Sequence, residues 1–272
     1  MRVSTVLERN NVTLTGRPDG PTLLLGNGFG VDQDVWRRLL PFFTADHRVV
    51  QFDHVGATGS DLSAYDSVRY GSLHGYADDV LRICAELDLR DVTYVGHSVG
   101  AMIGVLAAVA DPTPFRDLVL IAPSPRYVDD PADGYVGGFS QADIDEALES
   151  LDTNYTAWAQ AMAPMVMGNP ARPELGEELT VGFVHTDPTI AREFARVLFT
   201  SDHRADLPQV RTPSLVLQCA SDILAPTAVG EYLGRNLPGS TVVHLAATGH
   251  CPQVSAPAET AAAIRAHRDR VR

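Results

Sequence analysis

The sequence lacks long hydrophobic runs and an excess of basic residues. Its longest apolar stretch, residues 101–110, is about half the length that a transmembrane helix needs, and the first ten residues lack the apolar core of a signal peptide. Lys and Arg number 21 against 34 Asp and Glu, which gives a net charge of −13. Because polyanions attract basic surfaces, we expect neither nucleic acid nor a membrane as a partner.

Cysteine is also scarce. The three cysteines, Cys84, Cys219 and Cys251, are far apart in the sequence, and an odd number without metal-ligand spacing indicates a reducing compartment. The chain contains no H-E-x-x-H motif and no paired cysteine spacing. We therefore predict a cytoplasmic protein and expect no metal and no cofactor.

The order of apolar segments predicts an α/β protein. With 272 residues, 45% of them hydrophobic, the chain can form one large domain with an insertion, or two small domains. Helical stretches at 73–87 and 101–110 separate several strand-like runs. This alternation indicates a mostly parallel central sheet flanked by helices on both faces. The predicted strands are residues 12–15, 22–25, 48–52, 92–95, 118–121, 214–218 and 241–245.

The alternation stops between about Tyr127 and Ser201, where only helices are predicted. Ser140, with an acid three residues later, resembles a capping box that opens a helix running toward Leu151. An Asp-Pro pair opens the last helix of the block. A helical block between two strands of such a sheet commonly forms a lid over its carboxyl edge, so we predict a lid at 127–201 between two core segments, 1–126 and 202–272. Further helices are expected at 153–162, 173–184 and 188–199.

A G-x-S-x-G motif lies between a predicted strand and a predicted helix. Residues 96–100 read Gly-His-Ser-Val-Gly, which in this context is typical of a nucleophile elbow. The two glycines allow the strand and helix to approach each other closely. Ser98 would then lie at the helix N-terminus, where free amides favour developing negative charge. The alternative is a tight turn with an incidental serine.

Two later loops supply partners for such a serine. Asp222 follows the strand at 214–218, and His250 follows the next strand after a glycine. The order serine, acid, histidine is the one found with this elbow, so we predict that Asp222 orients His250 and that His250 takes the Ser98 proton. Asp222 could instead be a turn or N-cap residue. Asp206 is the second candidate acid, and Cys251 a weaker candidate nucleophile.

Glycines follow two early strands. In the loop at 26–30, Gly-Asn-Gly-Phe-Gly, the Phe29 amide is predicted to join the Val99 amide in an oxyanion hole. The alternative is a plain turn or a phosphate loop, which the missing Gly-Lys-Ser/Thr disfavours. The segment at 53–61 lacks the start of a dinucleotide fingerprint, and we interpret it as a structural turn.

Together these segments resemble the α/β-hydrolases, and more narrowly the RsbQ group of bacterial stress-response regulators, which is related to the plant karrikin and strigolactone receptor hydrolases. The resemblance runs from the glycine loop at 26–30 to the C-terminal helix and includes Phe52-Asp-His-Val-Gly, Ser124-Pro-Arg-Tyr and Gly249-His-Cys-Pro. It implies the same triad and oxyanion donors. One departure is Asn27, where the family usually has a histidine that supports the loop.

The resemblance implies a four-helix lid over an enclosed, mainly apolar pocket. Such a pocket over an activated serine suits a small hydrophobic ester or lactone. It also implies an alternative function as a signalling regulator that activates a sensor-domain phosphatase of the PP2C type, and a cofactor-free haloperoxidase or a carbon–carbon bond hydrolase on the same scaffold stays open. The predicted pocket residues are Phe29, Phe139, Trp158, Met162, Phe183, Val197 and Phe199.

Overall fold

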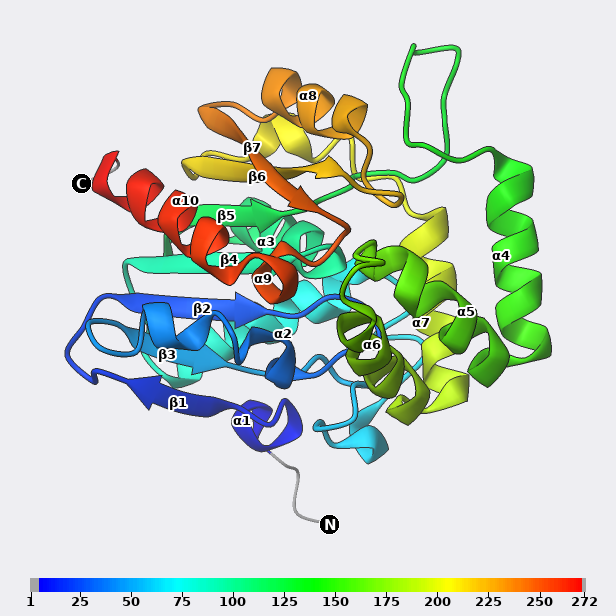
Figure 1. Cartoon of the computed structure of the whole chain (residues 1–272). Coiled ribbons are helices and arrows are strands. Elements are labelled where there is room, and N and C mark those ends of the chain that lie inside the picture. The colour runs from blue at the N-terminus through cyan, green and yellow to red at the C-terminus, as the bar shows by residue number, and fades with distance from the viewer. Residues whose placement is uncertain (1–4, 271–272) are drawn as a thin grey trace.

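The computed structural model describes residues 5–270, which build a seven-stranded sheet with the strand order β1-β3-β2-β4-β5-β6-β7 (Figure 1). All neighbouring strands are parallel except the edge pair β1 and β3. The central strands are almost continuously buried because helices cover both faces. The strands are β1 (Thr13–Gly16), β2 (Thr22–Gly26), β3 (Arg48–Gln51), β4 (Val92–His97), β5 (Phe115–Ile121), β6 (Ser214–Ser221) and β7 (Ser240–Thr248).

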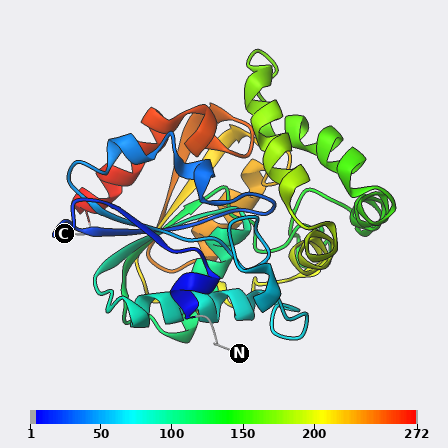
Figure 2. The same ribbon diagram turned by 90° about the horizontal axis from the view of Figure 1, so that it is seen from below.

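Helices flank the sheet on its two faces, which confirms the predicted fold class. Viewed from below, α2 (Leu73–Glu86) and α3 (Val99–Ala110) lie on one face and α10 (Pro257–Arg270) on the other (Figure 2). Residues of α3 are buried on nearly every side, as its run of small and apolar residues requires. The remaining helices outside the lid are α1 (Val6–Arg9), α8 (Thr227–Asn236), α9 (Pro252–Ser255) and the short 3₁₀ helices η1 (Gln33–Trp36), η2 (Leu40–Phe42), η3 (Leu62–Ala64) and η4 (Leu207–Gln209).

Four α-helices lie between β5 and β6 in the sequence, and they gather beyond the carboxyl edge of the sheet (Figure 1). We call them the lid helices; the exact extent of the lid, 127–201, stays a proposal. The capping box predicted at Ser140 is present, since Ser140 and Asp143 exchange both hydrogen bonds. The lid helices are α4 (Gln141–Thr153), α5 (Tyr155–Met167), α6 (Pro173–His185) and α7 (Pro188–Thr200).

Helix α5 continues beyond the predicted end at Met162. It passes through Pro164 and ends at Met167, and the C-cap residue Gly168 has a left-handed backbone with φ of 61°. Proline removes one amide donor, but packing of α5 against α6 keeps the chain helical. The extra turn brings the end of α5 to the core of the protein, where its carbonyls meet the loop after β7.

Ion pairs tie the lid to the core near the sheet edge. Glu178 of α6 accepts from Arg38 at 2.8 Å and also pairs with Arg37. These side chains are partly exposed, so such pairs stabilise the fold only modestly. Across the described residues, no helix is long and apolar enough to span a membrane.

Candidate active site

The serine of the motif occupies the sharp turn between β4 and α3. Ser98 has φ of 55° and ψ of −123°, a conformation that non-glycine residues rarely adopt. The turn is so tight that a Cβ on Gly96 would lie 2.5 Å from the carbonyl oxygen of Gly100. Ser98 is only 4% exposed. The strained turn therefore presents a buried hydroxyl at the start of a helix.

The three predicted triad residues come together at the carboxyl edge of the sheet. The Nε2 atom of His250 lies 2.7 Å from Ser98 Oγ, and its Nδ1 lies 2.7 Å from Asp222 Oδ2. All three residues are buried. Because the carboxylate can only accept, Nδ1 carries a proton, and in the neutral ring Nε2 is then free to accept from the serine. The arrangement provides a continuous path for a proton from hydroxyl to imidazole.

Asp222 both contacts His250 and holds the turn that follows β6, so the two predicted roles are not alternatives. Its Oδ1 accepts from the amides of Leu224 at 2.8 Å and Ala225 at 3.2 Å, while Oδ2 faces His250. Burial alone would raise the pKa of Asp222, but the charge of His250 and these hydrogen bonds outweigh it and lower the pKa below its ordinary value. The turn thus supplies the donors that keep this carboxylate ionised.

The alternative residues lie elsewhere or are chemically unsuited. Asp206 pairs with His203, with 3.0 Å between its Oδ2 and the Nδ1 of that ring. Cys251 lines the same cavity as Ser98, but burial raises the pKa of its thiol. A thiol is nucleophilic only as the thiolate, so Cys251 is a packing residue.

The loop at 26–30 faces the elbow, and Asn27 holds it. The Nδ2 of Asn27 donates to the carbonyl of Phe52 at 3.0 Å and to Asp53 Oδ1 at 3.2 Å. Its Oδ1 accepts from the indole of Trp36 at 2.6 Å. Every polar atom of this buried side chain is therefore used, which supports the loop in the place of the family's usual histidine.

The two amides predicted as oxyanion donors have no partner within the described part of the chain. The Val99 amide is the first of α3, where helical geometry leaves it unpaired. The Phe29 side chain packs edge-on against Trp158 and Phe183 of the lid. Val99 is part of the elbow, and the loop that carries Phe29 lies against it. The role of these two amides as donors stays a proposal.

An apolar cavity of about 40 Å³ lies over the serine. Five of the seven predicted pocket residues line it: Phe29, Trp158, Met162, Phe183 and Phe199. The rings of Trp158 and Phe183 are stacked with 6.0 Å between centroids. Since a single water needs about 10–15 Å³, a cavity of this volume holds only a few water-sized groups.

Two predicted pocket residues do not line this cavity. Val197 shares the outer face of α7 with Glu193, Arg196 and Thr200, and these line a surface groove instead. Helical periodicity turns Leu198 and Phe199 toward the cavity and Val197 away from it. Phe139 does not line the cavity either; its ring centroid lies 6.5 Å from that of Tyr127, which does line it.

Several lining residues were not predicted. Tyr127 follows the end of β5, and its position after a strand's carboxyl end could have indicated it. Burial raises the pKa of its hydroxyl, while a hydrogen bond with Ser98 partly opposes that rise. The others belong to the lid, the elbow or loops around the cavity, and no local pattern distinguishes them: Val31, Val35, His97, Val166, Leu179, Leu198, Leu224 and Cys251.

Comparison with known proteins agrees with the fold. Residues 21–257 match the family described as alpha/beta hydrolase fold. The chain is 40% identical to the strigolactone esterase D14 of Arabidopsis thaliana, with 96% of both chains covered. It is also 40% identical to the karrikin insensitive 2 receptor CA of Petunia hybrida, with 93% of both covered.

A solved hydrolase from Oleispira antarctica superimposes with a TM-score of 0.93 at 40% identity, covering 97% of this chain and 96% of that one. The predicted kinship with the plant receptor hydrolases and the prediction of a hydrolase are thereby confirmed. From its sequence, its sheet and its relatives, the chain belongs to the α/β-hydrolase family.

Proposed function

We propose that the protein is a serine hydrolase of small hydrophobic esters or lactones. The observation that carries this proposal is the chain of two 2.7 Å contacts from Ser98 through His250 to Asp222 inside an apolar cavity. A hydroxyl with a buried imidazole as its base is an activated nucleophile. The cavity lining is almost entirely apolar, which favours a substrate of the same character.

The groups account for both halves of an acyl transfer. Ser98 Oγ attacks the substrate carbonyl while His250 takes the serine proton, and the amides of Phe29 and Val99 receive the negative charge that develops on the oxygen. The ester bond then breaks, and His250 returns the proton to the leaving alcohol. Water attacks the acyl-enzyme by the same route in reverse, releasing the acid and the free serine.

The size of the cavity constrains how substrates enter. Ligand pockets usually measure several hundred Å³, whereas this cavity measures about 40 Å³. Substrates with more than a few heavy atoms therefore require the lid helices or their side chains to move outward. A short acyl group is the part that fits beside the serine with the least displacement.

The substrate test uses a fluorophosphonate probe and short p-nitrophenyl esters. The parent protein should be labelled on Ser98 and should hydrolyse p-nitrophenyl acetate, and Ser98→Ala should lose labelling and at least about 10³-fold of kcat. Full turnover by Ser98→Ala would remove the proposal. Parallel assays measure bromide-dependent oxidation and carbon–carbon bond cleavage, the other reactions open to this scaffold. Either activity in a protein that does not hydrolyse the esters would identify that reaction instead.

A second function is favoured by the relatives named as receptors. In this proposal the protein belongs to the RsbQ group, and its liganded form activates a cytoplasmic sensor-domain phosphatase. Three buried, unpaired thiols, Cys84, Cys219 and Cys251, suit the cytoplasm. A sensor-domain phosphatase encoded beside this gene, and its co-purification with the protein, would support the proposal. A gene neighbourhood without such a phosphatase, or its failure to bind, would count against it.

A further inference from the structure

The lid contributes backbone contacts to the candidate base as well as apolar side chains to the cavity. The amide of His250 donates to the carbonyl of Val166 in the last turn of α5 at 2.9 Å. The final carbonyls of a helix have no partner within the helix. One of them is therefore satisfied by the residue that the proposed mechanism uses as its base.

The other side of the His250 backbone is held by the elbow. His97 Nε2 lies 2.8 Å from the His250 carbonyl oxygen. Because a carbonyl only accepts, Nε2 must carry the proton, and Nδ1 of His97 is left without a partner among the described residues. Burial and the charge of His250 lower the pKa of His97 to about 3, so the ring is neutral at pH 7 and keeps this tautomer.

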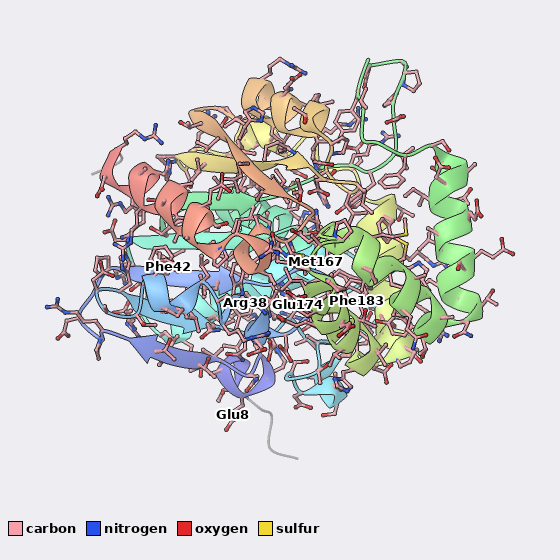
Figure 3. The ribbon with its side chains drawn as sticks, in the orientation of Figure 1. Glu8, Arg38, Phe42, Met167, Glu174 and Phe183 are labelled. Atoms are coloured by element: carbon pink, nitrogen blue, oxygen red, sulfur yellow. The ribbon has the colours of Figure 1, made fainter. Side chains whose placement is uncertain are left out.

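The end of α5 and the loop that carries His250 contact each other at two glycines, Gly168 and Gly249. A Cβ on Gly249 would lie 1.8 Å from the carbonyl oxygen of Met167, and one on Gly168 would lie 2.8 Å from Gly249 Cα. Met167 lies where the lid meets the core (Figure 3). Asn169 adds a second link, since its Nδ2 donates to the carbonyls of Met167 and Thr248. No side chain larger than hydrogen fits between the two backbones.

We propose that Gly168 and His97 are positioning residues that clamp the His250 backbone between the lid and the elbow and thereby set the distance from Nε2 to Ser98 Oγ. The inference rests on the proposed hydrolase function. The clamp makes the end of α5 part of the catalytic machinery. A displacement of this helix end moves the base even when the cavity lining is intact.

The test compares two glycines with the same backbone strain and different surroundings. Gly168 has φ of 61°, and Gly239 has φ of 68° with nothing within 4 Å of an added Cβ. Gly168→Ala and Gly239→Ala should both lower the melting temperature, because both place a Cβ in left-handed backbone, and Gly168→Ala should lower it further because its Cβ also meets the Gly249 backbone. Only Gly168→Ala should also lower kcat for p-nitrophenyl acetate by about 10- to 100-fold, with KM within about twofold of the parent value.

A readout without turnover separates this inference from the hydrolase proposal. The proton on His250 Nδ1, shared with Asp222, should give a low-field proton resonance in NMR spectra. The resonance should be present in the parent and in Gly239→Ala and should be weakened or shifted in Gly168→Ala. This result supports the clamp even if no tested ester is hydrolysed. An unchanged resonance together with equal kcat in the two variants would overturn it.

The elbow side provides a second test if Gly168→Ala does not fold. His97→Leu removes the donor to the His250 carbonyl, and His97→Gln places an amide donor near the position of Nε2. We expect kcat to fall about tenfold in His97→Leu and to recover at least in part in His97→Gln, with KM little changed. Equal activity of the leucine variant and the parent would contradict the clamp.

Discussion

The sheet edge and the lid contribute different kinds of groups to the same cavity. The sheet edge supplies polar groups held by strained or hydrogen-bonded backbone: Ser98 in its tight turn, Asp222 in its turn, and the loop braced by Asn27. The lid supplies apolar side chains, such as Trp158 and Phe183, and carbonyls at the end of α5. In the proposed mechanism the chemistry depends on core residues, while the lid shapes the cavity and helps to position the loop that carries His250.

The largest effect should come from the carboxylate on the core side. Asp222→Asn keeps an oxygen for the turn but no longer holds His250 in the right tautomer, so kcat should fall about 10³- to 10⁴-fold with little unfolding. Asp206→Asn is the matched control, since Asp206 pairs with His203 away from the cavity, and it should keep full activity. Equal losses in both variants, measured with p-nitrophenyl acetate, would contradict the assignment.

Two buried histidines of the core should make the free energy of unfolding fall at acidic pH. Burial is the main cause that lowers the pKa of His97 to about 3 and that of His54 to about 4. Below about pH 6.5 these two histidines take up protons in the unfolded chain, whereas in the folded protein they stay neutral until the pH nears their lowered pKa values. Their contribution to the free energy of unfolding is therefore complete above about pH 6.5 and is lost as the pH falls toward the folded pKa values. From pH 7 to pH 5, each ring should cost about 2 kcal/mol in the free energy of unfolding.

Urea denaturation at the two pH values measures this loss. His97→Gln removes one of these two buried rings, so the variant should lose about 2 kcal/mol less of its free energy of unfolding between pH 7 and pH 5 than the parent. Parallel losses in the variant and the parent would show that the ring titrates normally in the folded state.

On the lid side, we expect a change in substrate preference without loss of chemistry. Met162 lines the cavity, whereas Met165 on the same helix is 57% exposed. Met162→Ala should raise the ratio of kcat/KM for the hexanoate over the acetate ester by about tenfold, as the volume of one or two methylenes becomes available. Met165→Ala should leave this ratio unchanged. A change of the same size in both variants would contradict this role of Met162, because it would show that any truncation on α5 alters substrate preference.

The smallest effect should come from Cys251. Its thiol is buried and packs against apolar neighbours, so Cys251→Ala should cost about 1 kcal/mol of stability. Ester turnover should stay within twofold of the parent. Loss of labelling by the fluorophosphonate in this variant would restore the cysteine as a candidate nucleophile.

Local patterns predicted the core better than the lid. The strand predicted at 92–95 and the elbow after it are confirmed because a buried apolar run and a glycine-flanked turn are local properties. Helix α5 was predicted to end at Met162, but it continues through Pro164 to Met167, where packing against α6 keeps the chain helical. Val197 and Phe139 were placed in the cavity wrongly, because hydrophobicity alone does not tell which face of a lid segment turns inward.

The sequence by itself determined the elbow, the order of the three polar residues and the presence of an inserted helical block, because each follows from neighbouring residues and chain order. Only the tertiary structure decided which side chains enclose the cavity, that Asp222 is both turn and partner, and that α5 ends against His250. These contacts join residues far apart in the sequence; Ser98 and His250, for example, are 152 positions apart. They arise from packing between elements, which no local pattern encodes.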